Sequence, residues 1–163
     1  MERLITEPMS LEKLRKFLPP DSHAVLYKEL DASALKHKNS VVVLYETQVN
    51  KKKIGHFIVI LKRPGGAEYF SSLGRSPADE QKSLSLDSEK FKTLVGKKYT
   101  YNKTALQNSQ NYRINDCGRW CIARVLLADM SISEFVQLVH RKNVTTDQKI
   151  AFASLLLDRF VQI

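Results

Sequence analysis

The chain has 163 residues, of which 43% are hydrophobic, and a formal net charge of +9 at pH 7. This length supports one domain with a hydrophobic core and is short for two, so we expect a single domain over residues 1–163. No stretch approaches 18 consecutive apolar residues, and the N-terminus alternates charged with apolar residues. These features argue against a membrane span and a signal peptide. We therefore expect a soluble protein that is not secreted.

The N-terminal half is predicted to hold a short helix and three strands. Ser10 and Glu12 form a capping pattern before apolar residues that share one face, which predicts a helix over residues 10–18. Runs rich in β-branched residues, separated by polar and Gly-Pro turns, predict three buried strands. These strands are expected at residues 40–47, 56–63 and 67–74. Because they follow one another directly, we expect them to pair antiparallel.

The C-terminal half is predicted to be mainly helical. After a loop that carries Ser76 and Pro77, one helix is expected over residues 88–96, while residues 98–106 are compatible with strand or loop. Apolar periodicity predicts further helices, with Ser131 and Thr145 or Thr146 as N-caps. These helices are expected at residues 119–130, 131–141 and 145–163. The predicted fold class is α+β, with a central, mostly antiparallel sheet flanked by helices.

Cys117 and Cys121 are the only cysteines of the chain. Helix geometry disfavours a disulfide between two cysteines at this spacing. The four histidines are scattered and supply no second ligand pair, so no metal site is expected. Cys121 lies on an apolar helix face and is interpreted as a core residue. Cys117 instead stands between Asp116 and Gly118 at the start of the helix, where backbone amides favour a thiolate. We therefore predict that Cys117 is a nucleophile.

A nucleophilic thiol needs a base and an oxyanion donor. His56 is the preferred base among the histidines, because it directly follows Gly55 at the start of a buried strand. Gln107 and Gln110, just before the cysteine, are both candidates for the oxyanion donor.

The order of these motifs resembles one protease superfamily. Gly55-His56-Phe57, then YFSSLG at 69–74, then Gln110 seven residues before Cys117, are similar to the adenain and ubiquitin-like-protease superfamily of cysteine proteases. The seven-residue spacing, and the segments HAVLYKELDA and YTYN, resemble the maturation proteases of adenoviruses, Maverick/polinton elements and virophages. The resemblance implies a papain-like fold whose nucleophile begins a helix.

The resemblance also implies roles for the site residues. Cys117 and His56 would form a thiolate–imidazolium pair, Gln110 and the Cys117 amide would hold the oxyanion, Gly118 would let a substrate approach, and Phe57 would cover the imidazolium. Substrates would be capsid and other virion precursors, cut after small residues such as Gly, in the virion and the infected host cell.

Ser71 departs from the motif, because the superfamily has Asp, Glu or Asn at this position. Strand alternation places Ser71 on the face of Tyr69 and directs Glu68 to the other face, so Glu68 is a poor substitute. We predict that the Ser71 hydroxyl assists His56 as the third member of the site.

The positive charge predicts an anionic partner, for which nucleic acid is the first candidate. For a viral protein this partner would be viral DNA. The basic residues that would contribute are Lys51, Lys52, Lys53, Lys62, Arg63, Lys97 and Lys98. No metal or organic cofactor is expected. Whether activity requires DNA or a peptide as an activator stays open at this point. Two alternatives remain beside the protease: a deconjugase for a ubiquitin-like modifier, and a non-catalytic, nucleic-acid-binding virion protein.

Overall fold

The computed structural model describes residues 9–49, 52–86, 89–106 and 116–139, and of 47–49 and 52–54 it describes the backbone alone. Within these residues, five strands form one sheet in the order β1-β2-β3-β4-β5. The strands are β1 (Ser22–Leu26), β2 (Ser40–Val49), β3 (Lys52–Arg63), β4 (Gly66–Ser71) and β5 (Tyr99–Tyr101). The long central strands β2 and β3 carry the β-branched runs that predicted them.

The sheet is mixed, which corrects the expected mostly antiparallel arrangement. The three predicted strands do pair antiparallel, β2 with β3 and β3 with β4. The two edge strands, however, run parallel to their neighbours, β1 beside β2 and β5 beside β4. Parallel neighbours require a crossover connection. The segment between β1 and β2, which includes the 3-10 helix η1 (Tyr27–Glu29), and the helical segment between β4 and β5 supply these crossovers.

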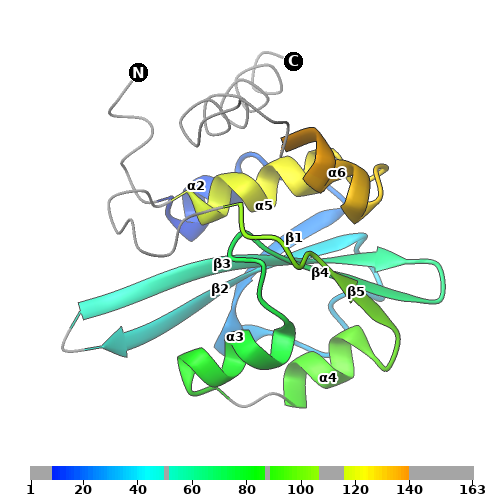
Figure 1. The fold of residues 1–163 in the computed structure, drawn as a ribbon. Helices are drawn as coiled ribbons and strands as arrows, with labels where there is room; N and C mark the ends of the chain where they lie inside the picture. The colour runs from blue at the N-terminus through cyan, green and yellow to red at the C-terminus, as the bar shows by residue number, and fades with distance from the viewer. Residues whose placement is uncertain (1–8, 50–51, 87–88, 107–115, 140–163) are drawn as a thin grey trace, which may run out of the picture.

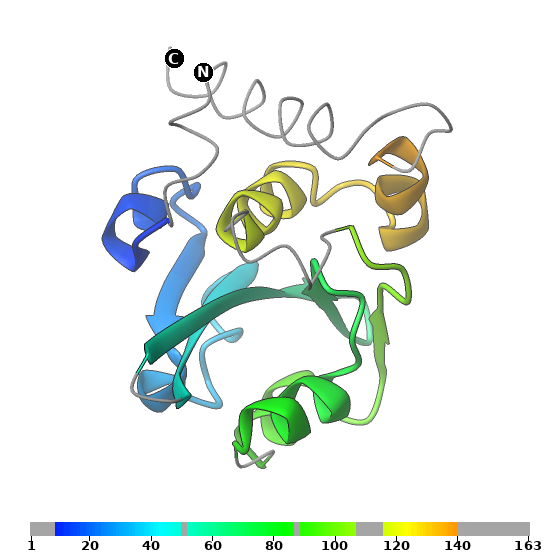
Figure 2. The ribbon, with the colours of Figure 1, turned by 60° about the vertical axis from the view of Figure 1, so that its left-hand side comes forward.

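Helices cover both faces of the sheet (Figures 1 and 2). On one face lie α2 (Leu11–Arg15), α5 (Cys117–Leu126) and α6 (Ile132–Val139), and on the other lie α3 (Pro77–Leu84) and α4 (Glu89–Val95). The predicted Ser10 cap is confirmed, since its hydroxyl accepts from the Lys13 amide, although the helix is shorter than expected. The helix predicted over residues 145–163 lies outside the described residues.

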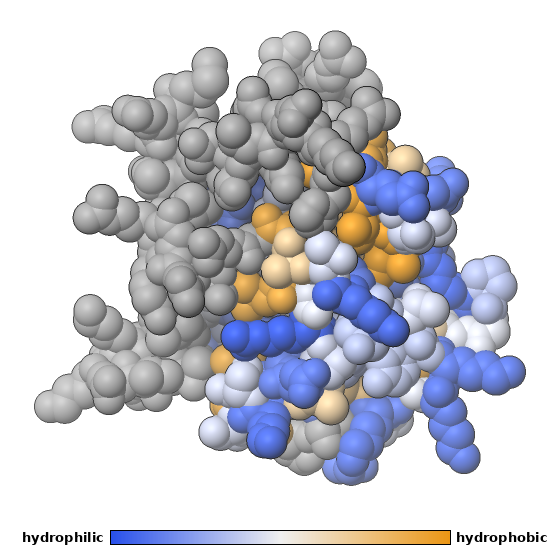
Figure 3. Space-filling view, in the orientation of Figure 1, coloured by the Kyte–Doolittle hydropathy of each residue, from blue (hydrophilic) through white to orange (hydrophobic). Residues whose placement is uncertain are grey.

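Strand alternation divides the apolar side chains into two cores. Phe57, Val59 and Leu61 of β3 face α5 and pack with Trp120 and other residues of that helix. Ile58 and Ile60 face the opposite layer, where Phe91 of α4 packs among tyrosines. On the outer surface in Figure 3, the visible hydrophobic residues lie in the upper half, and the lower half is mostly hydrophilic.

Helix α3 replaces the loop that the sequence analysis predicted after β4. Its N-cap is Ser76, whose hydroxyl accepts from the Asp79 amide at 3.2 Å, and Pro77 occupies the first turn. Serine followed by proline and, three residues on, by an acidic residue is a known start signal for a helix. The signal was therefore present in the sequence, and the helix it starts brings Glu80 to the sheet.

A buried ionic network fixes α5 on its face of the sheet. Arg124 of α5 and Glu68 of β4 are 0% and 2% exposed, and the arginine binds both carboxylate oxygens, at 2.6 and 3.0 Å. Arg63 donates to the same carboxylate at 2.7 Å and to the carbonyl of Ala128. Arg124 also donates to the Met130 carbonyl, so β3, β4 and the end of α5 share one charge-assisted network.

We expect Glu68→Gln to lower the free energy of unfolding by about 3 kcal/mol, because it leaves the Arg124 guanidinium buried without its carboxylate. Urea unfolding followed by circular dichroism measures this loss. Arg63→Ala is the matched control and should cost about 1 kcal/mol or less, since that arginine is partly exposed. Equal, small losses in both variants would contradict the view that the Arg124 pair holds α5.

Candidate active site

His56 lies in β3, directly across from Tyr45 of β2, and its side chain is 8% exposed. The imidazole shares the α3 side of the sheet with Ser71 of β4. Its Nε2 atom lies 3.2 Å from Ser71 Oγ. The structure therefore places His56 and Ser71 side by side, as expected from strand alternation, and their roles as base and orienting group stay predictions.

Glu80 of α3 stands behind this pair, where sequence reasoning placed no functional residue. Ser71 Oγ donates to Glu80 Oε2 at 2.6 Å, and the other carboxylate oxygen lies 3.6 Å from His56 Nε2. Arg75 approaches the same oxygen at 3.8 Å from the partly exposed end of the site. Glu80 itself is 1% exposed. A buried carboxylate thus lies on the histidine side of the sheet, contributed by the helix that was predicted as a loop.

Asn102, which follows β5, holds the backbone of Ser71 in place. Its side-chain oxygen accepts from the Ser71 amide at 3.0 Å, and its side-chain nitrogen donates to the Ser71 carbonyl at 2.6 Å. The Leu73 amide also donates to Ser71 Oγ. Asn102 thus holds the Ser71 backbone, while the hydroxyl itself is bound by the Leu73 amide and by Glu80.

The protonation of this pair is governed by burial. Burial lowers the pKa of His56 to about 4, and the charge of Arg75 contributes in the same direction. The pKa of Glu80 is raised by burial, while the Ser71 hydrogen bond and Arg75 oppose the rise. At neutral pH the imidazole is therefore uncharged.

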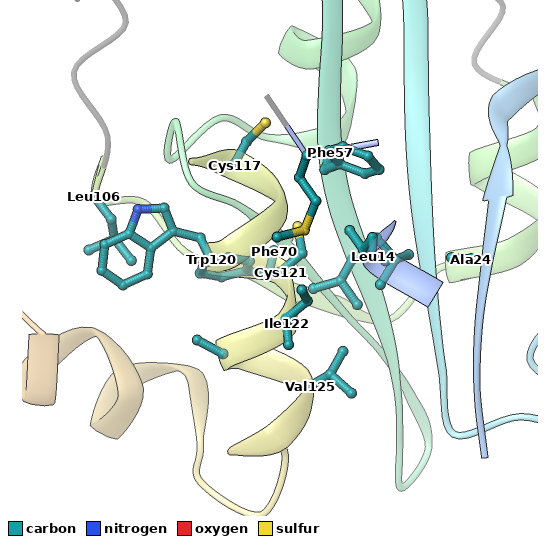
Figure 4. Packing of buried hydrophobic residues seen from close by; sticks show 14 of the residues in the cluster. Leu14, Ala24, Phe57, Phe70, Leu106, Cys117, Trp120, Cys121, Ile122 and Val125 are labelled. Atoms are coloured by element: carbon teal, nitrogen blue, oxygen red, sulfur yellow. The ribbon is translucent and has the colours of Figure 1, made fainter. Parts of the chain in front are cut away.

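Cys117 is the first residue of α5, as predicted for a nucleophile at a helix N-terminus. Figure 4 shows its sulfur at the end of the helix, directed away from the rings of Trp120 and Phe70. The residue is nevertheless 7% exposed and belongs to the core beneath α5. Only a small part of the Cys117 surface is therefore exposed to solvent in this conformation.

The next residue, Gly118, permits a close approach by the chain itself. A Cβ atom at Gly118 would lie 3.2 Å from the Phe57 ring and 3.3 Å from Met9. The approach of a substrate at Gly118 stays a prediction. In the structure the glycine lets α5 pack closely against Phe57 of β3 and against Met9.

Phe57 does not cover the imidazole, which corrects the predicted cation–π contact. Successive residues of a strand point to opposite faces, so the Phe57 ring lies on the α5 side and the His56 ring on the α3 side. Its backbone has a different role: the Phe57 amide, with those of Gly118 and Cys117, lies close enough to the Cys117 sulfur to lower its pKa. The thiol thus adjoins the residue that follows His56.

Burial outweighs these amides and raises the pKa of Cys117 to about 11, and the charge of Asp116 acts in the same direction. Among the described residues, no hydrogen bond joins His56 to Cys117. In this conformation both groups therefore favour the uncharged form at neutral pH, and the expected thiolate–imidazolium pair stays a prediction. The reason is desolvation, which the sequence pattern could not show.

The other predicted site residues have varied outcomes. Gln110 and Gln107 lie outside the described residues. Cys121 is fully buried in the core, as interpreted from its helix face, and both cysteines are free thiols. Asp116 accepts from the Trp120 indole at 3.0 Å, and burial raises its pKa to about 6.

The predicted basic residues separate into two groups. Lys52 and Lys53 begin β3, whereas Lys62 is its second-last residue, roughly 30 Å away at the usual rise of a strand. Lys62 is exposed, and the exposed Lys97 and Lys98 join it at the β3–β4 hairpin, where Lys98 bonds the Ala67 amide through its carbonyl. The predicted Arg63 is instead engaged by Glu68. Lys51 lies outside the described residues.

A groove of about 810 Å³ lies beside this hairpin, far along β3 from His56. Lys97 and Lys98 line it together with Asp129 and Glu134, so its charge is mixed. Within the described ranges, no three His, Cys, Asp or Glu side chains are grouped to hold a metal ion. No helix in the same ranges is long and apolar enough to cross a membrane.

Comparison with known proteins places the chain in one protein family. No family model matches it. It is 31% identical over 127 residues to the uncharacterized protein V9 of Sputnik virophage, a match that covers 71% of this chain and 70% of V9. The chain therefore belongs to the V9 family. A solved structure, the central domain of the uncharacterized Lpg1148 protein from Legionella pneumophila, aligns over 94% of this chain and 99% of its own, with a TM-score of 0.47 and 10% identity.

The depressed pKa of His56 predicts how stability varies with acid. The unfolded chain binds a proton near pH 6.5 and the folded protein only near 4, so His56 removes about 3 kcal/mol of stability as the pH falls between these values. Asp116 acts oppositely because its folded pKa is raised. We therefore expect His56→Gln to unfold less readily with acid than wild type does across pH 6.5 to 4.

Urea unfolding at several pH values measures this difference. His23→Gln, which replaces an exposed histidine of β1, is the matched control. Parallel stability curves for wild type and His56→Gln would show that His56 titrates normally and is not desolvated.

Proposed function

We propose that this protein is a cysteine endopeptidase that processes capsid or other virion precursor polypeptides. The observation that carries the proposal is the arrangement around the sheet: Cys117 begins α5 with its sulfur against the Phe57 amide, and the adjoining His56 is held at Nε2 by Ser71. A thiol at a helix start, a histidine in the strand that packs against that helix and a group that fixes the histidine are the parts of a nucleophilic site. The order of these residues along the chain carries the superfamily resemblance.

The proposed reaction starts from uncharged groups. As the substrate binds, His56 Nδ1, the ring nitrogen not engaged by Ser71, takes the proton of the Cys117 thiol, and the sulfur attacks the scissile carbonyl carbon. The carbonyl oxygen becomes an oxyanion that accepts from the Cys117 amide and, in this proposal, from Gln110. His56 then gives its proton to the leaving amine, which leaves a thioester. Water, deprotonated by His56, hydrolyses the thioester and restores the thiol.

The resting state explains why such a site would be quiet without substrate. With its pKa near 11, Cys117 holds its proton at neutral pH, so the free protein contains little thiolate. In this proposal, a bound substrate or an activator such as a peptide or DNA would favour transfer of the thiol proton to His56. The relative in a virophage supports an origin of the kind that the resemblance implies, and its own activity is uncharacterized.

The first rival is a deconjugase for a ubiquitin-like modifier, which would use the same residues. It is disfavoured by the seven-residue spacing between Gln110 and Cys117, which is typical of the viral branch. A modifier-based probe that ends in Gly-Gly separates the two, because only a deconjugase would be labelled by it.

We expect Cys117→Ala to abolish cleavage of a virion precursor while Cys121→Ala leaves most of the activity, although it lowers stability by opening a small cavity in the core. Cleavage is followed by mass spectrometry with a precursor encoded by the same genome. Circular dichroism confirms that both variants fold. Equal loss of cleavage in the two variants, or labelling of Cys121 alone by a peptide-based thiol probe, would contradict the assignment of the nucleophile.

Polyanion binding is a second candidate function, favoured by the net charge of +9 and the exposed lysines at the β3–β4 hairpin. We expect weak, sequence-independent binding to duplex DNA whose logarithmic constant falls with log salt at a slope of about −0.9 per phosphate contact. Fluorescence anisotropy across salt concentrations measures the slope. Changing Lys62, Lys97 and Lys98 to Gln should flatten it, and a wild-type constant that ignores salt would reduce the charge to a solvated surface.

A further inference from the structure

Glu80 of α3 is a buried carboxylate whose surroundings give it a defined task. It is 1% exposed, and its two oxygens are directed at the histidine pair: one accepts from Ser71 Oγ at 2.6 Å and the other lies 3.6 Å from His56 Nε2. A buried charge without such partners would be strongly destabilising. The carboxylate is therefore matched to the Ser71 hydroxyl and the imidazole.

The direction of these hydrogen bonds fixes the tautomer of His56. A serine hydroxyl has one proton, and Ser71 donates it in a hydrogen bond to the Glu80 carboxylate at 2.6 Å. Ser71 Oγ can then only accept from its other neighbours, which are the Leu73 amide and His56 Nε2. The proton of the neutral imidazole must accordingly sit on Nε2, which leaves a lone pair on Nδ1.

That tautomer is the one that the proposed reaction needs. Nδ1 can remove the thiol proton only if it carries no proton itself. Without a carboxylate behind it, the Ser71 hydroxyl could equally donate to Nε2, and Nδ1 would then hold the proton and be unable to act as base. A serine alone thus does not determine which ring nitrogen of His56 carries the proton. A serine whose hydroxyl donates to an anion does determine it.

We infer that Glu80 is the positioning residue of this site, and that it acts through Ser71 as the acid that the β4 motif lacks. The inference rests on the proposed function and deepens it. The orienting unit is the hydrogen-bonded series His56–Ser71–Glu80, called here the Glu80 chain. Its acid comes from α3, nine residues after Ser71, rather than from the strand beside the histidine. Asn102 keeps the serine in register between the two.

Other ionisable groups near Glu80 do not compete for this role. Tyr45 of β2 and Tyr69 of β4 lie on the same side of the sheet as the carboxylate, and Cys121 of α5 lies in the core on the other side. Burial raises the pKa of each, so all three stay uncharged in the acid and neutral range. Arg75 and Asp79, close to Glu80 in sequence, are the remaining charged neighbours. The Glu80 chain therefore couples the charge state of the Glu80 carboxylate to that of the His56 imidazole.

The first test uses Glu80→Gln, with Glu89→Gln on the exposed surface of α4 as the matched control. We expect Glu80→Gln to lower kcat of precursor cleavage by roughly ten- to a hundredfold with little change in KM, which is less than the ~10⁴ seen when a serine protease loses its acid. The acid limb of the pH profile should also move to lower pH, because a nearby carboxylate favours the imidazolium. Unchanged kcat and an unchanged acid limb would overturn the inference.

The second test is rescue by moving the acid. Ser71→Asp in the Glu80→Gln background places a carboxylate beside His56 directly and should recover most of the lost activity. Ser71→Asp alone should be less active than this double variant, because two buried carboxylates then share one site and one of them takes a proton. If the double variant is folded and no better than Glu80→Gln, Glu80 has a structural role and the inference fails.

The third test needs no enzymatic activity. In protein labelled with ¹⁵N-histidine, the ring nitrogen shifts of His56 report the tautomer, and we expect the Nε2–H form in wild type and a mixture in Glu80→Gln. Should Glu80→Gln not fold, Ser71→Ala interrupts the same hydrogen-bonded series, and the tautomer of His56 is measured in that variant in the same way. A wild-type Nδ1–H form would overturn the inference.

These readings separate the two proposals. If wild-type protein shows no cleavage that depends on Cys117, the protease proposal fails, while the tautomer of His56 still decides whether the Glu80 chain exists. If cleavage depends on Cys117 and the tautomer does not respond to Glu80, the protease stands and the role of Glu80 is refuted.

Discussion

The buried pair between Arg124 and Glu68 is the interaction on which the arrangement of this protein depends. A guanidinium that is fully removed from water is tolerable only with its charge and its donors satisfied, and here one carboxylate and two backbone carbonyls satisfy them. Because these partners come from β4 and from the turn after α5, the helix can occupy only one position along the sheet. Cys117, at the other end of the same helix, is placed by that constraint.

Strand β4 organises both faces of the molecule through its alternation. Glu68 reaches the α5 side and meets Arg124, while Ser71, three residues later, turns to the other side and meets His56 and Glu80. One short strand thus supplies the anion that positions the helix of the proposed nucleophile and the hydroxyl that binds the proposed base. Polar residues in a buried strand usually weaken it, and here each is matched to partners on a different layer.

The electrostatics of the resting site follow from this burial. Both halves of the proposed pair are deep in the protein, so desolvation disfavours the thiolate and the imidazolium alike. In the proposed reaction, the proton moves from Cys117 to His56 only when substrate is bound. The Glu80 chain would then supply the negative charge that compensates the imidazolium. In this proposal, the neutral resting state and the buried carboxylate are two parts of the same design.

The sequence by itself determined the α+β class, the three central antiparallel strands, the helix that begins at Cys117 and the pairing of His56 with Ser71. These features depend on local patterns: the β-branched runs, the apolar faces of the helices, and the two-residue alternation that put Ser71 on the face of Tyr69. Only the tertiary structure decided the parallel edge strands, the ring position of Phe57, the uncharged state of Cys117 and the approach of Glu80. Each of these depends on residues far apart in the chain or on the exclusion of water, which no local pattern records; even helix α3, whose cap is legible at Ser76, shows its importance only when the fold lays Glu80 against Ser71.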